Sequence, residues 1–385
     1  MNIQKYTQEA VELLECLIAK PSISRDEALA ADVMEQQMKA WGLNPRRFGN
    51  NIAAWDELDE QKPTLLLNAH IDTVKPVSSW TRDPFKPTLE GDRLYGLGAN
   101  DCGGGLVSLL TTYRLLNPPL GPQGRLPEQE PSTLNAPLGP QGRLPEQEPS
   151  TLNPQPSPPY NLIFLASAEE EVSGQGGISM ALPLLPKIDV AIVGEPTGMQ
   201  PAIAEKGLMV IDGIARGKSG HAARNEGVNA IYEALDDLIW LRDYRFKKVS
   251  KLLGPTKMTV TVINSGTQHN VVPDECRFVI DVRTNEFYQN EYLFSFLQKH
   301  TKSELKARSF RLSSSHIPVG HPLVQRCLQL GLRPFGSPTL SDQALMPFPS
   351  LKLGPGESAR SHSADEYICI SEIEHAIQTY LQLIC

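Results

Sequence analysis

The sequence lacks the features that mark several special classes of protein. It has no run of about 18 apolar residues, so we expect no membrane span. Its six cysteines are scattered without a Cys-x-x-Cys pair, which argues against a disulfide framework and a thiolate zinc site. Acidic residues dominate, with 44 Asp and Glu against 36 Lys and Arg, so nucleic acid is not an expected partner. Acids also interrupt the first apolar segment, which excludes a signal peptide. We therefore expect a cytoplasmic protein.

The chain contains a segment whose composition differs from the rest. Its 385 residues suffice for two domains, but residues 117–159 are rich in Pro, Gly, Gln and Glu. Residues 119–135 read PLGPQGRLPEQEPSTLN, and residues 137–153 repeat them without a change. Such a segment buries too little apolar surface to offset the entropy of ordering. We predict a disordered insertion, with a proline-rich docking ligand as the alternative.

The segment Leu65 to Asp72 organises the rest of the chain. Leu65-Leu-Leu reads as a strand buried on both faces. His70 and Asp72 follow at a spacing of two, which puts both on the same side if the strand continues. An imidazole beside a carboxylate at the carboxyl end of a strand suits metal binding. By itself this pair is a weak signal.

Further carboxylates follow other apolar or glycine-rich segments. Asp101 stands in a glycine-rich turn, where it could also be a helix N-cap; a phosphate loop is excluded because no Gly-Lys-Ser/Thr follows. The apolar strand expected over 161–168 ends in three glutamates, 169–171. The strand expected over 189–193 ends in Gly194-Glu195-Pro196. Adjacent acids repel one another unless one is protonated or a cation lies nearby.

The pattern of elements predicts an α/β protein with an inserted α+β domain. Amphipathic helices are expected over 7–20 and 24–41, the second with capping-box spacing between Ser24 and Glu27. From about residue 204 the order is β-α-β-β-α-β, with strands at 208–215, 258–264, 276–283 and 307–312. This order fits a small four-stranded domain. The chain then returns to the larger domain with a helix at 323–332, a strand at 350–353 and a final helix from Ser371.

Taken together, the motifs resemble the dinuclear-zinc aminoacylase and peptidase family, closest to acetylornithine deacetylase and succinyl-diaminopimelate desuccinylase. The resemblance covers the chain except residues 117–159. It implies a mixed central sheet flanked by helices, and a ferredoxin-like lid that serves in dimerisation. The implied domains are residues 1–203 and 312–385 for catalysis and 204–311 for the lid. The motifs are His70-x-Asp72, Asp101, Glu170-Glu171, Gly194-Glu195-Pro196 and His362.

The resemblance assigns a role to each motif residue. It implies two zinc ions per subunit, for which cobalt could substitute, with Asp101 bridging them and Asp72 orienting one histidine ligand. Glu170 corresponds to the general base, although the run of three glutamates leaves a shift by one residue open. The peptide bond from Asp101 to Cys102 is expected to be cis. The implied metal ligands are His70, Asp101, Glu171, Glu195 and His362.

The same resemblance extends to the lid. His221 corresponds to the histidine that stabilises the oxyanion, and Asn270 and Arg283 to residues that hold the substrate carboxylate. One position departs from the family pattern, because Gly103 stands where a lysine is common. That lysine is no metal ligand, so its loss leaves the implied activity in place.

The implied reaction is hydrolysis of the amide bond of an N-acylated amino acid by a homodimer. Our first choice of substrate is N²-acetyl-L-ornithine, cleaved to ornithine and acetate in arginine biosynthesis. Alternatives are a succinyl or acetyl group on ornithine or citrulline, N-succinyl-diaminopimelate, and a dipeptide or a peptide cleaved at its carboxyl end. An alternative outside the enzymes is a catalytically inactive relative that binds peptides. Its signature would be missing ligand residues.

Overall fold

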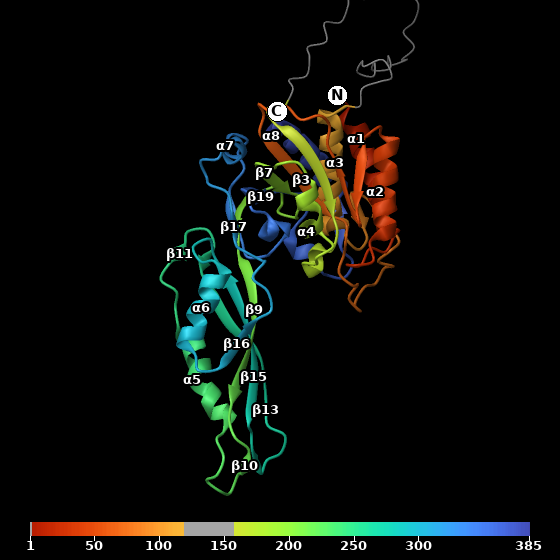
Figure 1. The fold of residues 1–385 in the computed structure, drawn as a ribbon. Coiled ribbons are helices and arrows are strands. Elements are labelled where there is room, and N and C mark those ends of the chain that lie inside the picture. Colours follow the sequence, from red (N-terminus) through yellow and green to blue (C-terminus); the bar gives the residue numbers. More distant parts are fainter. Residues whose placement is uncertain (1, 119–157) are drawn as a thin grey trace, which may run out of the picture.

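The computed structural model describes residues 2–118 and 158–385. Figure 1 shows two bodies, a larger one that holds both termini and a smaller, elongated one below it. Residues 119–157 of the predicted disordered insertion lie outside the described residues. Its flanks are described: α3 (Gly104–Leu116) precedes it, and β6 (Asn161–Ser167) follows it. Asn161 pairs with Thr64, the first residue of β3 (Thr64–His70). The described strand that follows the insertion therefore begins at the edge of the sheet opposite His70.

The larger body is built on a mixed sheet, as predicted. The strand order is β1-β2-β6-β3-β7-β19-β8-β17, with β18 beside β8. The central strands β6, β3, β7 and β19 are parallel, whereas β2 and β8 run antiparallel to their neighbours β6 and β19. The remaining bounds are β1 (Pro45–Phe48), β2 (Asn51–Ala54), β7 (Val190–Val193), β8 (Ala202–Glu205), β17 (Ser315–His316), β18 (Phe335–Ser337) and β19 (Ser350–Lys352).

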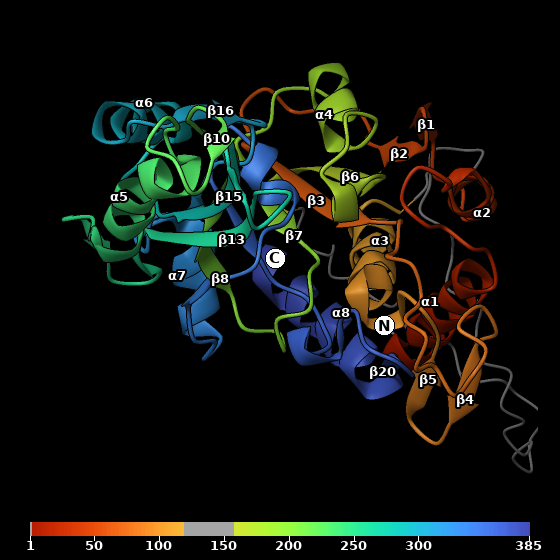
Figure 2. The same ribbon diagram turned by 90° about the horizontal axis from the view of Figure 1, so that it is seen from below.

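Helices cover both faces of this sheet, which explains the continuous apolar runs of its strands. Leu65 and Leu67 belong to the core under one face, whereas Leu66 belongs to the core under the other. Because side chains alternate along a strand, a strand buried on both faces must be apolar throughout. The first face is covered by α1 (Ile3–Ile18), α2 (Ala28–Ala40), α3, α7 (Pro322–Gln329) and α8 (Ile370–Ile384), and the second by α4 (Ile178–Ala181) with nearby short turns (Figure 2).

The smaller body has the predicted ferredoxin-like order. Its sheet runs β13-β15-β9-β16, and α5 and α6 pack on one face. The bounds are β9 (Gly207–Arg216), α5 (Ala230–Asp243), β13 (Lys257–Ser265), β15 (Glu275–Thr284), α6 (Asn290–His300) and β16 (Glu304–Ala307). Two short pairs complete it: β10 (Gly220–His221) with β14 (Val271–Val272), and β11 (Val249–Ser250) with β12 (Gly254–Pro255).

Two local predictions were wrong. The last lid strand is β16, and residues 308–312 belong to the connection back to the larger body. The Asn290 side chain donates to the carbonyl oxygens of Phe310 and Leu312, and the Leu312 carbonyl also accepts from the Leu208 amide on β9. Ser24 does not cap α2, because its hydroxyl donates to Asp72. The capping-box spacing therefore reflects a long-range contact.

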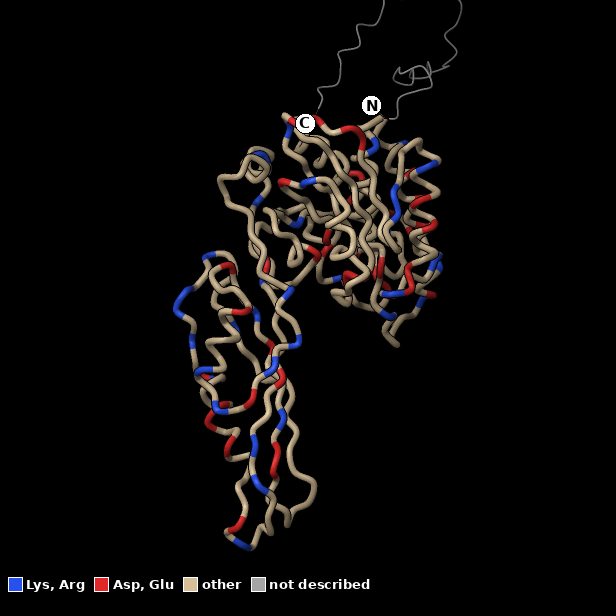
Figure 3. The backbone as a smooth tube through the Cα atoms, viewed as in Figure 1, with Lys and Arg blue, Asp and Glu red and all other residues tan. Residues whose placement is uncertain are grey.

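A three-stranded sheet was not predicted. It contains β20 (Tyr367–Cys369), β5 (Arg93–Tyr95) and β4 (Thr88–Glu90) in that order. Among the helices of the described residues, none is long and apolar enough to cross a membrane. Figure 3 shows Lys and Arg interspersed with Asp and Glu over both bodies.

Candidate metal centre

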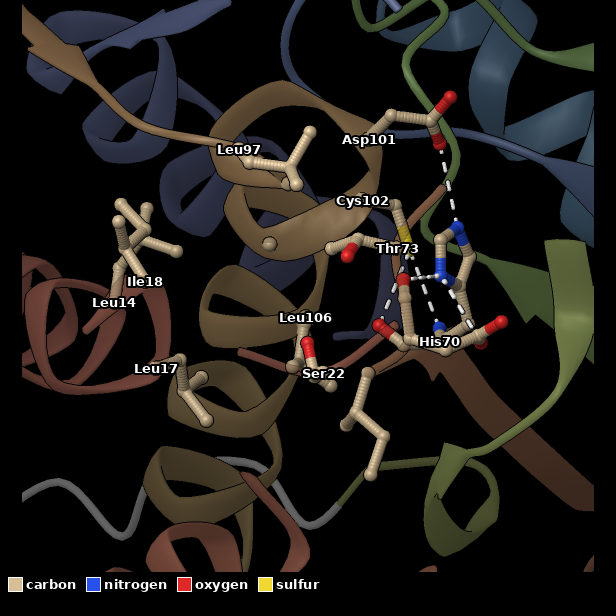
Figure 4. Close-up of a pocket in the computed structure, with 14 residues that line it drawn as sticks. Leu14, Leu17, Ile18, Ser22, His70, Thr73, Leu97, Asp101, Cys102 and Leu106 are labelled. Carbon is tan, nitrogen blue, oxygen red and sulfur yellow. Dashed lines mark hydrogen bonds and ion pairs between the residues drawn. The ribbon is translucent and has the colours of Figure 1, made fainter. Parts of the chain in front are cut away.

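The predicted ligands gather where the parallel strands of the large sheet end. His70 is the last residue of β3 and pairs with Ser167, the last residue of β6. One residue separates the glutamate run from the end of β6, and one residue separates Glu195 from the end of β7. The carboxyl ends of parallel strands therefore bring together side chains that lie far apart in the sequence. Figure 4 shows the His70 ring pointing toward the Asp101 carboxylate, and both residues line the same pocket.

The Asp72 carboxylate is occupied by hydrogen bonds to other protein groups. Its carboxylate accepts from the backbone amides of Glu170 and Glu171 at 3.0 and 3.1 Å, and from the Ser24 hydroxyl at 2.7 Å. One carboxylate oxygen also lies 3.5 Å from Nδ1 of His70, and the Asp72 carbonyl oxygen lies 2.8 Å from the same nitrogen. A proton on Nδ1 leaves Nε2 free to bind a cation.

Asp101 lies between the two histidines of the site. Its Oδ1 is 3.3 Å from Nε2 of His70, and its Oδ2 is 3.5 Å from Nε2 of His362. Each oxygen of one carboxylate thus faces a different imidazole, which is the arrangement that a bridging ligand requires. The expected cis peptide bond between Asp101 and Cys102 is confirmed.

The three glutamates after β6 point in different directions. The Glu169 carboxylate folds back on the following glycine-rich loop and accepts from the amide of Gly176. Glu171 faces His362, with its carboxylate oxygens 3.0 and 3.1 Å from Nε2. Glu170 is the remaining acid, and burial together with the nearby Glu195 carboxylate raises its pKa well above the ordinary value. The register in which Glu170 is the base stays a prediction at this point.

Glu195 has a buried carboxylate oxygen, Oε1, without a hydrogen-bond partner. That oxygen lies 3.7 Å from Nε2 of His70. Burial and the neighbouring Asp101 raise the pKa of Glu195 to about 8. The start of α3 can approach the residue before Glu195 only because position 105 is glycine, where a Cβ atom would stand 1.7 Å from the carbonyl oxygen of Gly194.

The donor set fits divalent cations. The side-chain donor atoms of His70, Asp101 and Glu171 lie within 4.8 Å of one another, as do those of His70, Cys102 and Glu195. Imidazole and carboxylate are the ligands of non-thiolate zinc sites. A cation would also reverse the electrostatic cost of gathering these acids, because it favours their charged forms. The unpartnered oxygen of Glu195 indicates a place where such an ion would bind.

The loop that carries His362 is fixed by two residues that sequence reasoning missed. The Asn100 side chain bonds to the backbone of Glu357 and donates to the Ser361 hydroxyl. The buried Glu366 accepts from the backbone amides of Asn100 and Asp101 at 2.8 and 2.9 Å, and burial raises its pKa to about 7. Neither residue was assigned a role from the sequence. Only the fold shows that the turn at Asp101 is bonded to the loop that carries His362.

The predicted lid residues do not gather at the metal centre of their own chain. His221 and Asn270 lie at the free end of the lid, where His221 pairs with Val271 and Asn270 accepts from the amide of Ala222; Figure 1 shows this end pointing away from the larger body. Arg283 lies near the opposite end of β15, paired with Leu208 at the start of β9, and its guanidinium contacts Asp281. Within one chain, His221 and Asn270 therefore lie at the opposite end of the lid from Arg283.

Comparison with known families finds two matching domains. Residues 203–309 match the peptidase dimerisation domain, and residues 66–126 match peptidase family M20/M25/M40. The chain is 28% identical to acetylornithine deacetylase of Proteus mirabilis over 417 residues, which cover 100% of this chain and 97% of the relative. It is 25% identical to succinyl-diaminopimelate desuccinylase of a Caulobacter strain over 322 residues, which cover 80% and 73%.

Solved structures share the fold. A tripeptidase of Staphylococcus aureus matches with a TM-score of 0.70 and 18% identity, covering 98% of this chain and 97% of that one. A dinuclear metal-binding peptidase of Bacillus subtilis matches with a TM-score of 0.67 and 16% identity, covering 99% and 98%. At these identities the likeness concerns the fold alone, a larger α/β body with a smaller inserted α+β body.

Proposed function

We propose that this chain, which carries the domains of the M20 peptidase family, hydrolyses the amide bond of an N-acylated amino acid with two divalent metal ions. The observation that carries the proposal is the Asp101 carboxylate, which presents one oxygen to His70 and the other to His362. We assign catalysis to residues 1–203 and 312–385, and the lid to residues 204–311. The homology to acetylornithine deacetylases along the whole chain supports a hydrolase of this kind.

The residues around the bridge divide into two ligand sets. His70 and Glu195 would hold one ion, and Glu171 and His362 the other, with Asp101 shared. We propose zinc as the metal, since zinc accepts imidazole and carboxylate ligands, with cobalt able to replace it. Two such ions would lower the pKa of a water molecule and polarise the amide carbonyl.

Glu170 supplies the proton transfers. Its raised pKa suits a carboxylate that takes a proton from the attacking water and returns it to the leaving amine. Asp72 acts through His70, whose ring it orients. His221 would donate a hydrogen bond to the developing oxyanion, and Asn270 and Arg283 would bind the substrate carboxylate.

A panel of substrates tests the proposal. The purified, zinc-loaded protein should release free amine fastest from N²-acetyl-L-ornithine, because acetylornithine deacetylases match the chain over nearly their whole length. The panel should also contain N-succinyl-ornithine, N-acetyl-citrulline, N-succinyl-diaminopimelate and simple dipeptides, with Glu170→Ala protein as the blank. Faster release from another member would reassign the substrate. No release from any member would refute the proposed reaction.

The lid surface supports a homodimer. Its α5 helix exposes Tyr232, Leu235 and Ile239 at spacings of three and four residues, with 43–68% of each exposed. The helix packs against β13, an edge strand that exposes Val262 and Ile263. An apolar helix face beside an unpaired strand edge suits contact with a second copy of the same lid.

Charge placed on this face should separate the subunits. We expect Leu235→Glu protein to elute as a monomer in size-exclusion chromatography with light scattering, whereas the native chain elutes at twice the monomer mass. Leu89→Glu is the matched control, since Leu89 is 50% exposed on the larger body. A dimeric Leu235→Glu protein would place the subunit contact elsewhere.

A further inference from the structure

Arg311 joins the lid to the glutamate turn of the metal centre. It lies in the connection from β16 back to the larger body. One guanidinium nitrogen donates to the carbonyl oxygen of Ser173 at 2.6 Å, and another donates to the Ser179 hydroxyl at 3.0 Å. Ser173 ends the short helical turn formed by residues 170–172. The lid connection therefore contacts the segment that carries the proposed base and one proposed ligand.

The backbone on both sides of Arg311 is hydrogen-bonded to the lid. The side chain of Asn290, at the start of α6, donates to the carbonyl oxygens of both Phe310 and Leu312. The Leu312 carbonyl also accepts from the amide of Leu208 on β9. Asn290 is almost completely buried. Movement of the lid would therefore carry the Arg311 backbone with it, while the Arg311 side chain is bound to the larger body.

The glutamate turn needs support from outside. Ser173 has a positive φ of 45°, as does Glu169 with 52°, and non-glycine residues adopt this region at a cost. On the inner side, Asp72 binds the amides of Glu170 and Glu171. Arg311 binds the opposite end of the turn with a charge-assisted hydrogen bond, which is stronger than a neutral one. The turn is thus held between Asp72 and the lid connection.

From these contacts we propose that Arg311 is a positioning residue that couples the lid to the turn carrying Glu170 and Glu171. Its loss would leave the ligands present but would let the turn shift relative to the substrate. Small displacements of a catalytic group lower the rate of the chemical step more than substrate binding. The effect on kcat rests on the proposed function, whereas the effect on the turn itself does not.

The test compares Arg311→Met with the matched variant Ser179→Ala. The first removes both contacts, and the second removes only the contact that does not involve the turn. In Arg311→Met we expect faster hydrogen exchange at the amides of residues 170–174 and a kcat reduced by about 10- to 100-fold, with KM changed little. Ser179→Ala should stay within about twofold of the native enzyme, because it keeps the bond to Ser173.

The hydrogen-exchange result tests the role of Arg311 independently of the proposed hydrolase function. Native exchange and native kcat in a folded Arg311→Met protein would overturn the coupling. A raised KM with unchanged kcat and exchange would also overturn it, because Arg311 would then be a substrate contact. If Arg311→Met does not fold, Arg311→Lys, which keeps the charge without the planar fork, is measured in the same way. If the native protein cleaves no N-acylated amino acid, the exchange result still decides whether Arg311 holds the turn.

Discussion

Replacing Asp101 by alanine should give a folded protein that retains almost no zinc and no measurable hydrolase activity. The reason is that, among the described residues, only Asp101 pairs with both histidines, at 3.3 and 3.5 Å. Its loss therefore removes a ligand and a negative charge from both proposed ions at once. The remaining acids repel one another without a cation, which favours their protonation over metal binding. Elemental analysis after dialysis should show near zero ions per chain, against about two in the native protein.

The control for this experiment is Asp189→Ala. Asp189 accepts from the Thr64 amide at the far edge of the same sheet, so its replacement removes one carboxylate from the opposite end of β3 without touching the site. This variant should retain native zinc and activity. Full zinc occupancy in Asp101→Ala would contradict the proposal that both ions share Asp101 as a ligand. If the variant loses only one ion, Asp101 is a ligand of that ion alone, and the two metal sites are independent.

The elements that the sequence predicted well are those with a strong local signal. Leu65 to Leu67 predicted a doubly buried strand, and the structure divides these side chains between two cores. The β-α-β-β-α-β order of the lid was also predicted, because alternation and helical periodicity differ clearly there. The proposed ligand positions came from recognising a set of motifs together. Each of them alone, such as His70-x-Asp72, would have been uninformative.

The errors and omissions share one physical cause, which is that long-range partners leave no local pattern. Ser24 has the spacing of a helix cap, yet its hydroxyl bonds to Asp72, 48 residues away. Glu366 supports the amides of the bridging turn from 265 residues away. Arg311 stands in what looked like a strand, although its function follows from a contact with Ser173. Only the folded arrangement distinguishes these residues from ordinary surface residues.

Replacing His221 by alanine should lower the rate by about 10²–10³ while leaving the zinc in place, if the histidine is an oxyanion donor. His221 is exposed at the free end of the lid. The strand β9 spans 10 residues from the larger body toward that end, and at about 3.3 Å per residue this is roughly 30 Å. In this arrangement His221 does not reach the proposed metal centre of its own chain. We therefore expect it to act in the site of a partner subunit.

Mixing two inactive variants tests this composite site. Glu170→Ala lacks the base, and His221→Ala lacks the donor, so a heterodimer has one site with both residues intact if each site draws its His221 from the other chain. Subunits that exchange at random give half heterodimers with one working site in two, and the activity should return to about a quarter of the native value. The Leu235→Glu form of either variant is the control, because a monomer cannot complement. If labelled subunits are seen to exchange and no activity returns, His221 serves its own chain, and the lid must close onto its own metal centre instead.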